Sequence, residues 1–192
     1  MSDAATESAR DEERARLPSE HLPSLQTLAS LLLYPHNALR SDTAAMNANH
    51  FGQSQLWGMA LSGDLPIVLL RTGGSNGSLL AQLVSAHQLW RRHGLEVDLV
   101  VLQTGGSAYV EPLRDDVVAL LRETGATEML GRNGGIHLVF ADQIGSDLVR
   151  LLEAVASAVL DEARGSLSDQ LSNALVTPSQ LPHISPSLPP HY

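Results

Sequence analysis

Three short runs of branched apolar residues constrain the fold of this chain most strongly. They occupy residues 65–70, 97–102 and 136–140 and are too short for helices, so they predict strands buried on both faces of a sheet. Each run is followed by apolar residues at helical spacing, as in the series from Leu148 to Val159 after the third run. Parallel strands joined by right-handed helical crossovers are the simplest arrangement for this order. The sequence therefore predicts an α/β fold, a small three-layer sandwich with a three-stranded parallel sheet.

The segments outside these runs predict one domain between two tails. An N-terminal helix with apolar residues on one face is expected before Pro35, which cannot continue it. Residues 1–20 alternate charge with alanine and lack the apolar segment of a signal peptide, so we expect a disordered tail there. Residues 165–192 end in a proline-rich stretch that includes a P-x-x-P spacing, and we expect them to be disordered too. The α/β domain is then residues 21–164.

Composition excludes several classes of chemistry. The chain has no cysteine and all of its basic residues are arginine, so thiolate metal sites, a Walker lysine and a Schiff-base lysine are impossible. Its formal charge of −9 argues against a nucleic-acid partner. The histidines show no metal-ligand spacing, and no apolar run is long enough to cross a bilayer. We therefore expect no cofactor, no metal and no direct membrane insertion, and a cytoplasmic location.

The tetrapeptide "TGGS" occurs twice, at residues 72–75 and 104–107, each time between a predicted strand and a predicted helix. In the first copy Ser75 lies in a G-x-S-x-G sequence, the pattern of a nucleophile elbow, and two acid–histidine pairs follow it in the required order, Asp98 with His137 and Asp142 with His183. A phosphate cradle is the second interpretation, because glycines let backbone amides approach an anion. A flexible turn is the third interpretation and the one we favour, because Asp98 and His137 fall inside predicted strands and His183 falls in the proline-rich tail.

Two carboxylates near the predicted strand ends also have two interpretations each. Asp64 can serve as a general acid, but a turn before Pro66 explains it more simply. Asp142 follows the third strand, where it can be a functional carboxylate or a residue that begins a loop or a helix. His87 lies on the apolar side of its helix, which favours a structural role.

The most specific stretch precedes and surrounds the first two strands. Its landmarks are "YP" at 34–35, "LR" at 39–40, Asn49, "GQS" at 52–54, "LW" at 56–57, "SGDLPI" at 62–67, "AH" at 86–87, "WR" at 90–91, "GL" at 94–95 and "VDLV" at 97–100. With these landmarks the chain resembles, from about Leu25 to Arg164, a region of the cyclic β-1,2-glucan synthases. These are very large bacterial membrane proteins with glycosyltransferase and glycoside-phosphorylase-like modules.

The resemblance implies a connecting segment beside the phosphorylase-like half of such a synthase, not a catalytic barrel. No catalytic residue is carried over, and the glycine loops resemble the family least, which suggests that they vary under weak constraint. The resemblance thus implies a non-catalytic module, or a fragment, that positions neighbouring domains or handles glucan beside the bacterial inner membrane. Its partners would be other domains of a glucan synthase-like protein and β-1,2-glucan. The alternative is a free-standing small α/β enzyme or a phosphate- or sugar-binding protein that uses the glycine-rich loops.

Three residues in the family-like stretch form the candidate ligand site: Gln53, Trp57 and Asp64. A tryptophan face packs on pyranose C–H groups, while amide and carboxylate groups bind hydroxyls. The alternative is that Trp57 covers the sheet edge or anchors a neighbouring domain.

Overall fold

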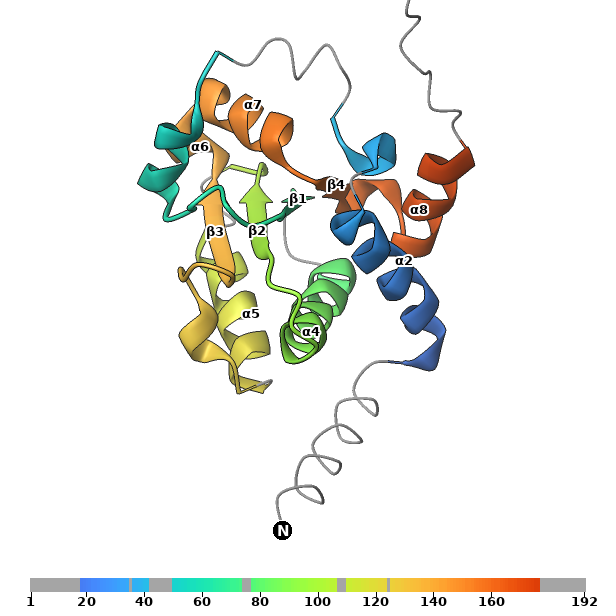
Figure 1. The fold of residues 1–192 in the computed structure, drawn as a ribbon. Helices are drawn as coiled ribbons and strands as arrows, with labels where there is room; N and C mark the ends of the chain where they lie inside the picture. Colours follow the sequence, from blue (N-terminus) through green and yellow to red (C-terminus); the bar gives the residue numbers. More distant parts are fainter. Residues whose placement is uncertain are drawn as a thin grey trace, which may run out of the picture.

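The computed structural model describes residues 18–34, 36–41, 50–73, 77–106, 110–123 and 125–176. Most of the two predicted tails, residues 1–17 and 177–192 with the P-x-x-P spacing, lies outside the described residues. The end of the predicted N-terminal tail at residue 20 is wrong, because the 3₁₀ turn η1 (Ser19–His21) begins at Ser19. Within the described part, one parallel sheet has helices on both of its faces (Figure 1).

The sheet has four strands, not the three that the sequence predicted. They are β1 (Ile67–Thr72), β2 (Asp98–Gln103), β3 (Ile136–Phe140) and β4 (Ala158–Asp161), in the order β3-β2-β1-β4. Every neighbouring pair is parallel. The parallel arrangement of the three predicted strands is therefore confirmed, with β1 displaced by two residues and β2 by one from the expected ranges.

The fourth strand was hidden by the helix before it. Helix α7 (Ser146–Val155) ends where the Ala156 N–H bonds to the carbonyl of Leu152, and the chain turns directly into β4. Val159 lies in β4 although it continues the helical spacing of α7, and no glycine or proline separates the two elements. Because the helical spacing of apolar residues continues into β4 without a break, the sequence predicted one helix where the structure has α7 followed by β4.

Alternate strand residues face opposite sides of the sheet, as the two-residue period of a strand requires. Val68 and Leu70 pack toward α4 (Ser78–Arg92), α5 (Val110–Glu123), α2 (Leu22–Leu33) and α8 (Leu167–Val176). Ile67 and Leu69 pack toward α7, α6 (Ala141–Ile144) and the 3₁₀ helix η3 (Gln53–Met59). The other 3₁₀ turns are η1 (Ser19–His21), η2 (Asn37–Leu39), η5 (Thr127–Met129) and η6 (Glu162–Arg164). Helix α2 confirms the N-terminal helix that the sequence predicted before Pro35.

Helix α8 lies inside the segment predicted as a disordered tail at 165–192, so that prediction was wrong for its first part. Ser166 and Asp169 form a reciprocal capping box: the Ser166 N–H donates to Asp169 Oδ2 at 3.1 Å and the Asp169 N–H to Ser166 Oγ at 3.2 Å. The hydrogen bond from the Ser166 hydroxyl lowers the pKa of Asp169. Leu167 and Leu171 are buried in the same core as α2, which gives the helix its tertiary support.

The chain order creates a topological switch beside β1. From β1 the crossovers through α4 and α5 lead across β2 to β3, and the crossover through α7 then returns to β4 on the other side of β1. Arg71 and Asp161 are neighbours in register at the carboxyl ends of β1 and β4. Open α/β sheets bind ligands at such a point. The residues of the candidate sugar site precede β1 instead.

Candidate functional site

The structure brings two of the three predicted site residues into contact. Gln53 Nε2 donates hydrogen bonds to the Ser62 carbonyl oxygen at 2.8 Å and to Asp64 Oδ1 at 3.3 Å. The Asp64 N–H donates to Ser62 Oγ at 3.1 Å, which fixes the turn before β1. Gly63 has φ +77°, and a Cβ there would lie 2.9 Å from Gln53 Cγ. The start of η3 and this turn are therefore packed as one unit that requires glycine at position 63.

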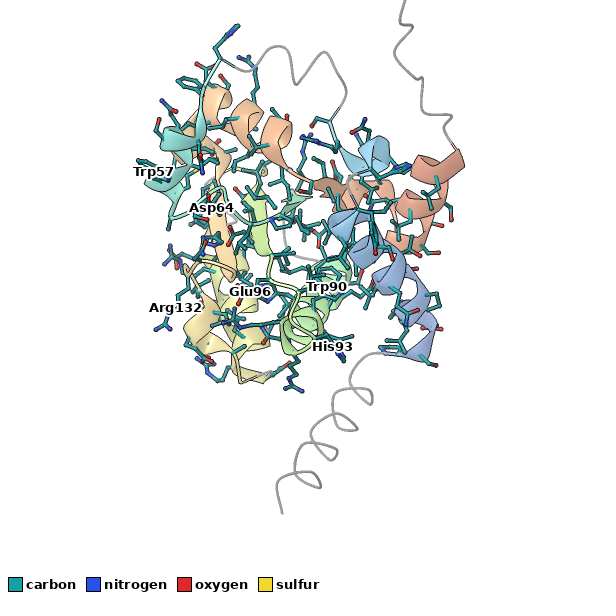
Figure 2. The ribbon with its side chains drawn as sticks, viewed as in Figure 1. Trp57, Asp64, Trp90, His93, Glu96 and Arg132 are labelled. Carbon is teal, nitrogen blue, oxygen red and sulfur yellow. The ribbon has the colours of Figure 1, made fainter. Side chains whose placement is uncertain are left out.

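Trp57, the third predicted residue, points into solvent. Its exposed fraction is 66 %, whereas that of the preceding residue, Leu56, is 2 %. Leu56 packs with Leu69 and Leu151 in the core on the α7 side, so Leu56 rather than Trp57 covers the sheet here. Figure 2 shows Trp57 on the outer side of η3. The Trp57 ring is thus an exposed, flat apolar surface on η3, and η3 is held against the core through Leu56.

A cavity of about 270 Å³ lies between η3, the start of β1 and α7. Phe51, Gln53 and Leu56 form one part of its wall, and Ile67 and Leu151 form another. Trp57 and Asp64 are not part of this wall. The structure therefore places the tryptophan on the outer surface of η3 and not inside the adjacent cavity.

The hydrogen bonds around Gln53 determine which groups remain for a ligand. Its amide nitrogen already donates to Ser62 and Asp64, and no hydrogen bond to Gln53 Oε1 or Asp64 Oδ2 occurs within the described part of the chain. Both residues are exposed, so these two acceptor oxygens remain available to a ligand. Sugar hydroxyls donate to such acceptors, so the arrangement suits binding of a carbohydrate more than acid–base chemistry.

The predicted partners of a serine nucleophile lie at the wrong end of the sheet. Asp98 Oδ1 accepts from the Gly134 N–H at 2.7 Å and is 3.2 Å from His137 Nε2, and both side chains are buried. Asp98 pairs in register with Ile67, at the end of β1 opposite to Thr72. Ser75 itself lies outside the described residues. The buried Asp98–His137 pair instead ties the loop before β3 to β2.

His87 belongs to the same buried network. Its Nε2 lies 3.1 Å from the carbonyl oxygens of both Val97 and Gly134, so the ring N–H can donate to them. Burial lowers the pKa of His87, which favours the neutral ring. The structural role that the sequence favoured for His87 agrees with this geometry.

The two glycine loops contact each other through their backbones. A Cβ on Gly105 would overlap the carbonyl oxygen of Gly73, and the Thr104 N–H donates to the Thr72 carbonyl at 2.8 Å. Only glycine fits at position 105, so the expectation that these loops vary under weak constraint is wrong there. The close contact supports the turn interpretation, although residues 74–76 and 107–109 lie outside the described part.

Asp142 is an exposed residue in the first turn of α6, which agrees with the helix-start interpretation. Within the described residues, no three His, Asp or Glu side chains gather closely enough to hold a metal ion. None of the helices in this part is long and apolar enough to cross a membrane.

No family model matches the chain. The chain is 30 % identical over 162 residues to a cyclic beta-(1,2)-glucan synthase, NdvB, from Rhizobium meliloti (strain 1021). The match covers 82 % of this chain but 6 % of that protein, so the chain spans a small part of the relative's length. This similarity supports a weak relationship to a region of a cyclic glucan synthase, in agreement with the resemblance seen in the sequence.

Proposed function

We propose that this chain is a non-catalytic module related to the cyclic glucan synthases, and that its η3 surface binds β-1,2-glucan. The observation that carries the proposal is Trp57, 66 % exposed on an anchored helix within the family-like stretch. A tryptophan ring offers a large, rigid apolar face with a polar N–H at one end, which suits it to stacking on a sugar ring. Gln53 Oε1 and Asp64 Oδ2, on exposed residues before β1, would accept hydrogen bonds from sugar hydroxyls.

The polar groups of the sheet support a non-catalytic role. Asp98 and His137 are buried and engaged with the loop before β3, so they have no access to a substrate. Asp64 is held by Gln53 and by its turn. General acid–base chemistry needs a group within hydrogen-bond reach of a bound substrate, which the buried pair is not.

The alternative of a ligand site in the glycine loops has less support. The backbones of the two loops pack on each other at Gly73 and Gly105, so packing already explains the glycine at position 105. The space that a Cβ would need there is filled by protein, not by an open cradle for a phosphate.

Calorimetric titration with linear and cyclic β-1,2-glucans tests the proposal. We expect saturable binding of at least one of these glucans to the unaltered protein. Trp57→Ala should weaken this binding at least about fivefold, because a stacked ring face contributes on the order of 1 kcal/mol. Tyr34→Ala is the matched control, because Tyr34 is an aromatic residue with 74 % exposure elsewhere on the surface.

Binding that survives Trp57→Ala unchanged would contradict the assignment to the η3 surface. Absence of binding to either glucan at millimolar concentration would contradict glucan handling altogether. The exposed Trp57 would then be the contact for a neighbouring domain of a larger synthase, which leaves domain positioning as the function of the module.

A further inference from the structure

A second cavity lies beside the topological switch, far along the chain from the candidate sugar site. Its volume is about 500 Å³, within the range of small-molecule sites. Arg71 near the end of β1 and Val159 in β4 line it, together with residues from the end of η2, from α7, from η6 and from α8. The cavity therefore lies near the carboxyl ends of β1 and β4, where open α/β sheets commonly bind ligands.

The charges in this cavity differ from those of the chain as a whole. Three arginines line it, Arg40, Arg71 and Arg164, although the chain has a formal charge of −9. One carboxylate, Glu153, also lines it, at 3.1 Å from Arg71 Nη1. Asp161 also lies near Arg71, with its Oδ2 3.8 Å from Nε. These two carboxylates compensate Arg71, whereas no ion pair of Arg40 or Arg164 occurs within the described residues.

Two guanidinium groups of the cavity carry buried donors that lack an acceptor. Arg40 Nε and Arg71 Nε are both buried and make no hydrogen bond to the described part of the chain. Buried polar groups in folded proteins nearly always have a partner, and an unpaired donor is unfavourable. An oxygen-rich ligand in the cavity would supply the acceptors that the protein does not.

The residues around the cavity are held in place before any ligand arrives. The side chain of Gln170, in α8, accepts from the Asp161 N–H at 3.0 Å and donates to the carbonyls of Asp161 at 2.8 Å and of Gly165 at 3.0 Å. Asp161 Oδ1 also accepts from the Ala163 N–H at 2.9 Å. The η6 turn that carries Arg164 is thus fixed to β4 and α8, which reduces the entropy lost when a ligand binds.

We propose that this cavity binds a small molecule through an oxyanion group, a phosphate or a carboxylate, held by Arg40 and Arg164 with Arg71 Nε at its base. Guanidinium groups are planar, permanently charged and matched in geometry to the paired oxygens of both anions. The cavity is larger than a bare phosphate, so the oxyanion is one end of an organic molecule. None of these residues belongs to the Trp57 surface, so the two proposals stand or fall separately.

Calorimetry at fixed ionic strength tests the proposal with two probes, inorganic phosphate and succinate, each against sodium chloride. We expect saturable binding of at least one probe, and the probe that binds identifies the anion. Arg164→Gln should weaken it roughly 10-fold to 100-fold, the effect of losing hydrogen bonds from a charged group. Arg164→Lys keeps the positive charge but lacks the planar guanidinium group, so its affinity for the probe should lie between those of the unaltered protein and Arg164→Gln. Arg164 is exposed, so these variants should fold like the unaltered protein.

Arg114→Gln is the matched control, because it removes the same charge from an exposed position on α5 that does not line the cavity. Binding equal to that of the unaltered protein is expected for this variant. If neither probe binds above the chloride control, the proposal is wrong. It is also wrong if Arg164→Gln and Arg114→Gln weaken binding equally, because the effect would then come from net charge and not from this cavity.

Discussion

Truncation of the two tryptophans of the chain should destabilise the protein to different extents. Trp57 is 66 % exposed on η3, whereas Trp90, a residue of α4, is 6 % exposed and packs in the core. Figure 2 shows the two rings far apart in the molecule. Because truncation removes buried contacts, Trp57→Ala and Trp90→Ala separate a surface role from a structural one within a single protein.

The expected magnitudes follow from burial. A tryptophan side chain buries at most about 250 Å², so the one third of Trp57 that is covered corresponds to roughly 80 Å² and about 2 kcal/mol at about 25 cal/mol/Å². This is an upper limit, since the unfolded chain also buries part of its apolar surface. Trp90→Ala should lower the free energy of unfolding by about 3–5 kcal/mol, as for other buried large aromatic residues.

Urea unfolding followed by far-UV circular dichroism measures both values under the same conditions. The slope of the free energy of unfolding with urea concentration should stay the same in Trp57→Ala, so that the midpoint alone reports stability. A loss above 3 kcal/mol for Trp57→Ala, or a loss equal to that of Trp90→Ala, would refute the placement of Trp57 on the surface.

Three further stability measurements follow from the contacts. Gly105→Ala should cost about 1–3 kcal/mol or more because its Cβ meets the Gly73 carbonyl, whereas Gly73→Ala, whose Cβ meets nothing, should cost far less; similar losses would contradict the close approach. Ser166→Ala should cost about 1 kcal/mol and reduce amide-exchange protection in α8; full protection would show that the capping box is unimportant. Burial lowers the pKa of His87, so the folded protein takes up this proton less readily than the unfolded chain and the free energy of unfolding falls as the pH drops below about 6.5. His87→Gln should flatten that part of the profile, and an unchanged profile would assign it to other groups.

The parallel sheet was predictable where burial is complete on both faces. All six residues of β2 are buried, so its run of apolar residues has no helical or alternating period and is recognised as a strand. β4 has four residues with alternating burial and follows α7 without a glycine or proline between them. Its short sequence could therefore not be distinguished from a continuation of the helix. The start of α8 did carry a readable signal, the S-x-x-D of Ser166 and Asp169, which the prolines after the helix obscured.

The sites were predictable only in part, because tertiary pairing creates them. Gln53 and Asp64 are close in sequence, and their contact agrees with the predicted cluster. The side of η3 that faces solvent was not predictable, since Leu56 and Trp57 are adjacent apolar residues and either can face the core. Arg40, Arg71 and Arg164 are distant in sequence, and the missed pairing of β1 with β4 brings the last two of them together.

The emission of Trp57 alone tests the central claim most directly. In a Trp90→Phe variant, Trp57 is the one remaining tryptophan, so its fluorescence reports the η3 surface without interference. If this surface binds glucan, titration with linear β-1,2-glucan should shift the emission to shorter wavelength in a saturable way, because the sugar displaces water from the ring. An unchanged spectrum at millimolar glucan, from a variant whose circular dichroism shows it to be folded, would contradict the account.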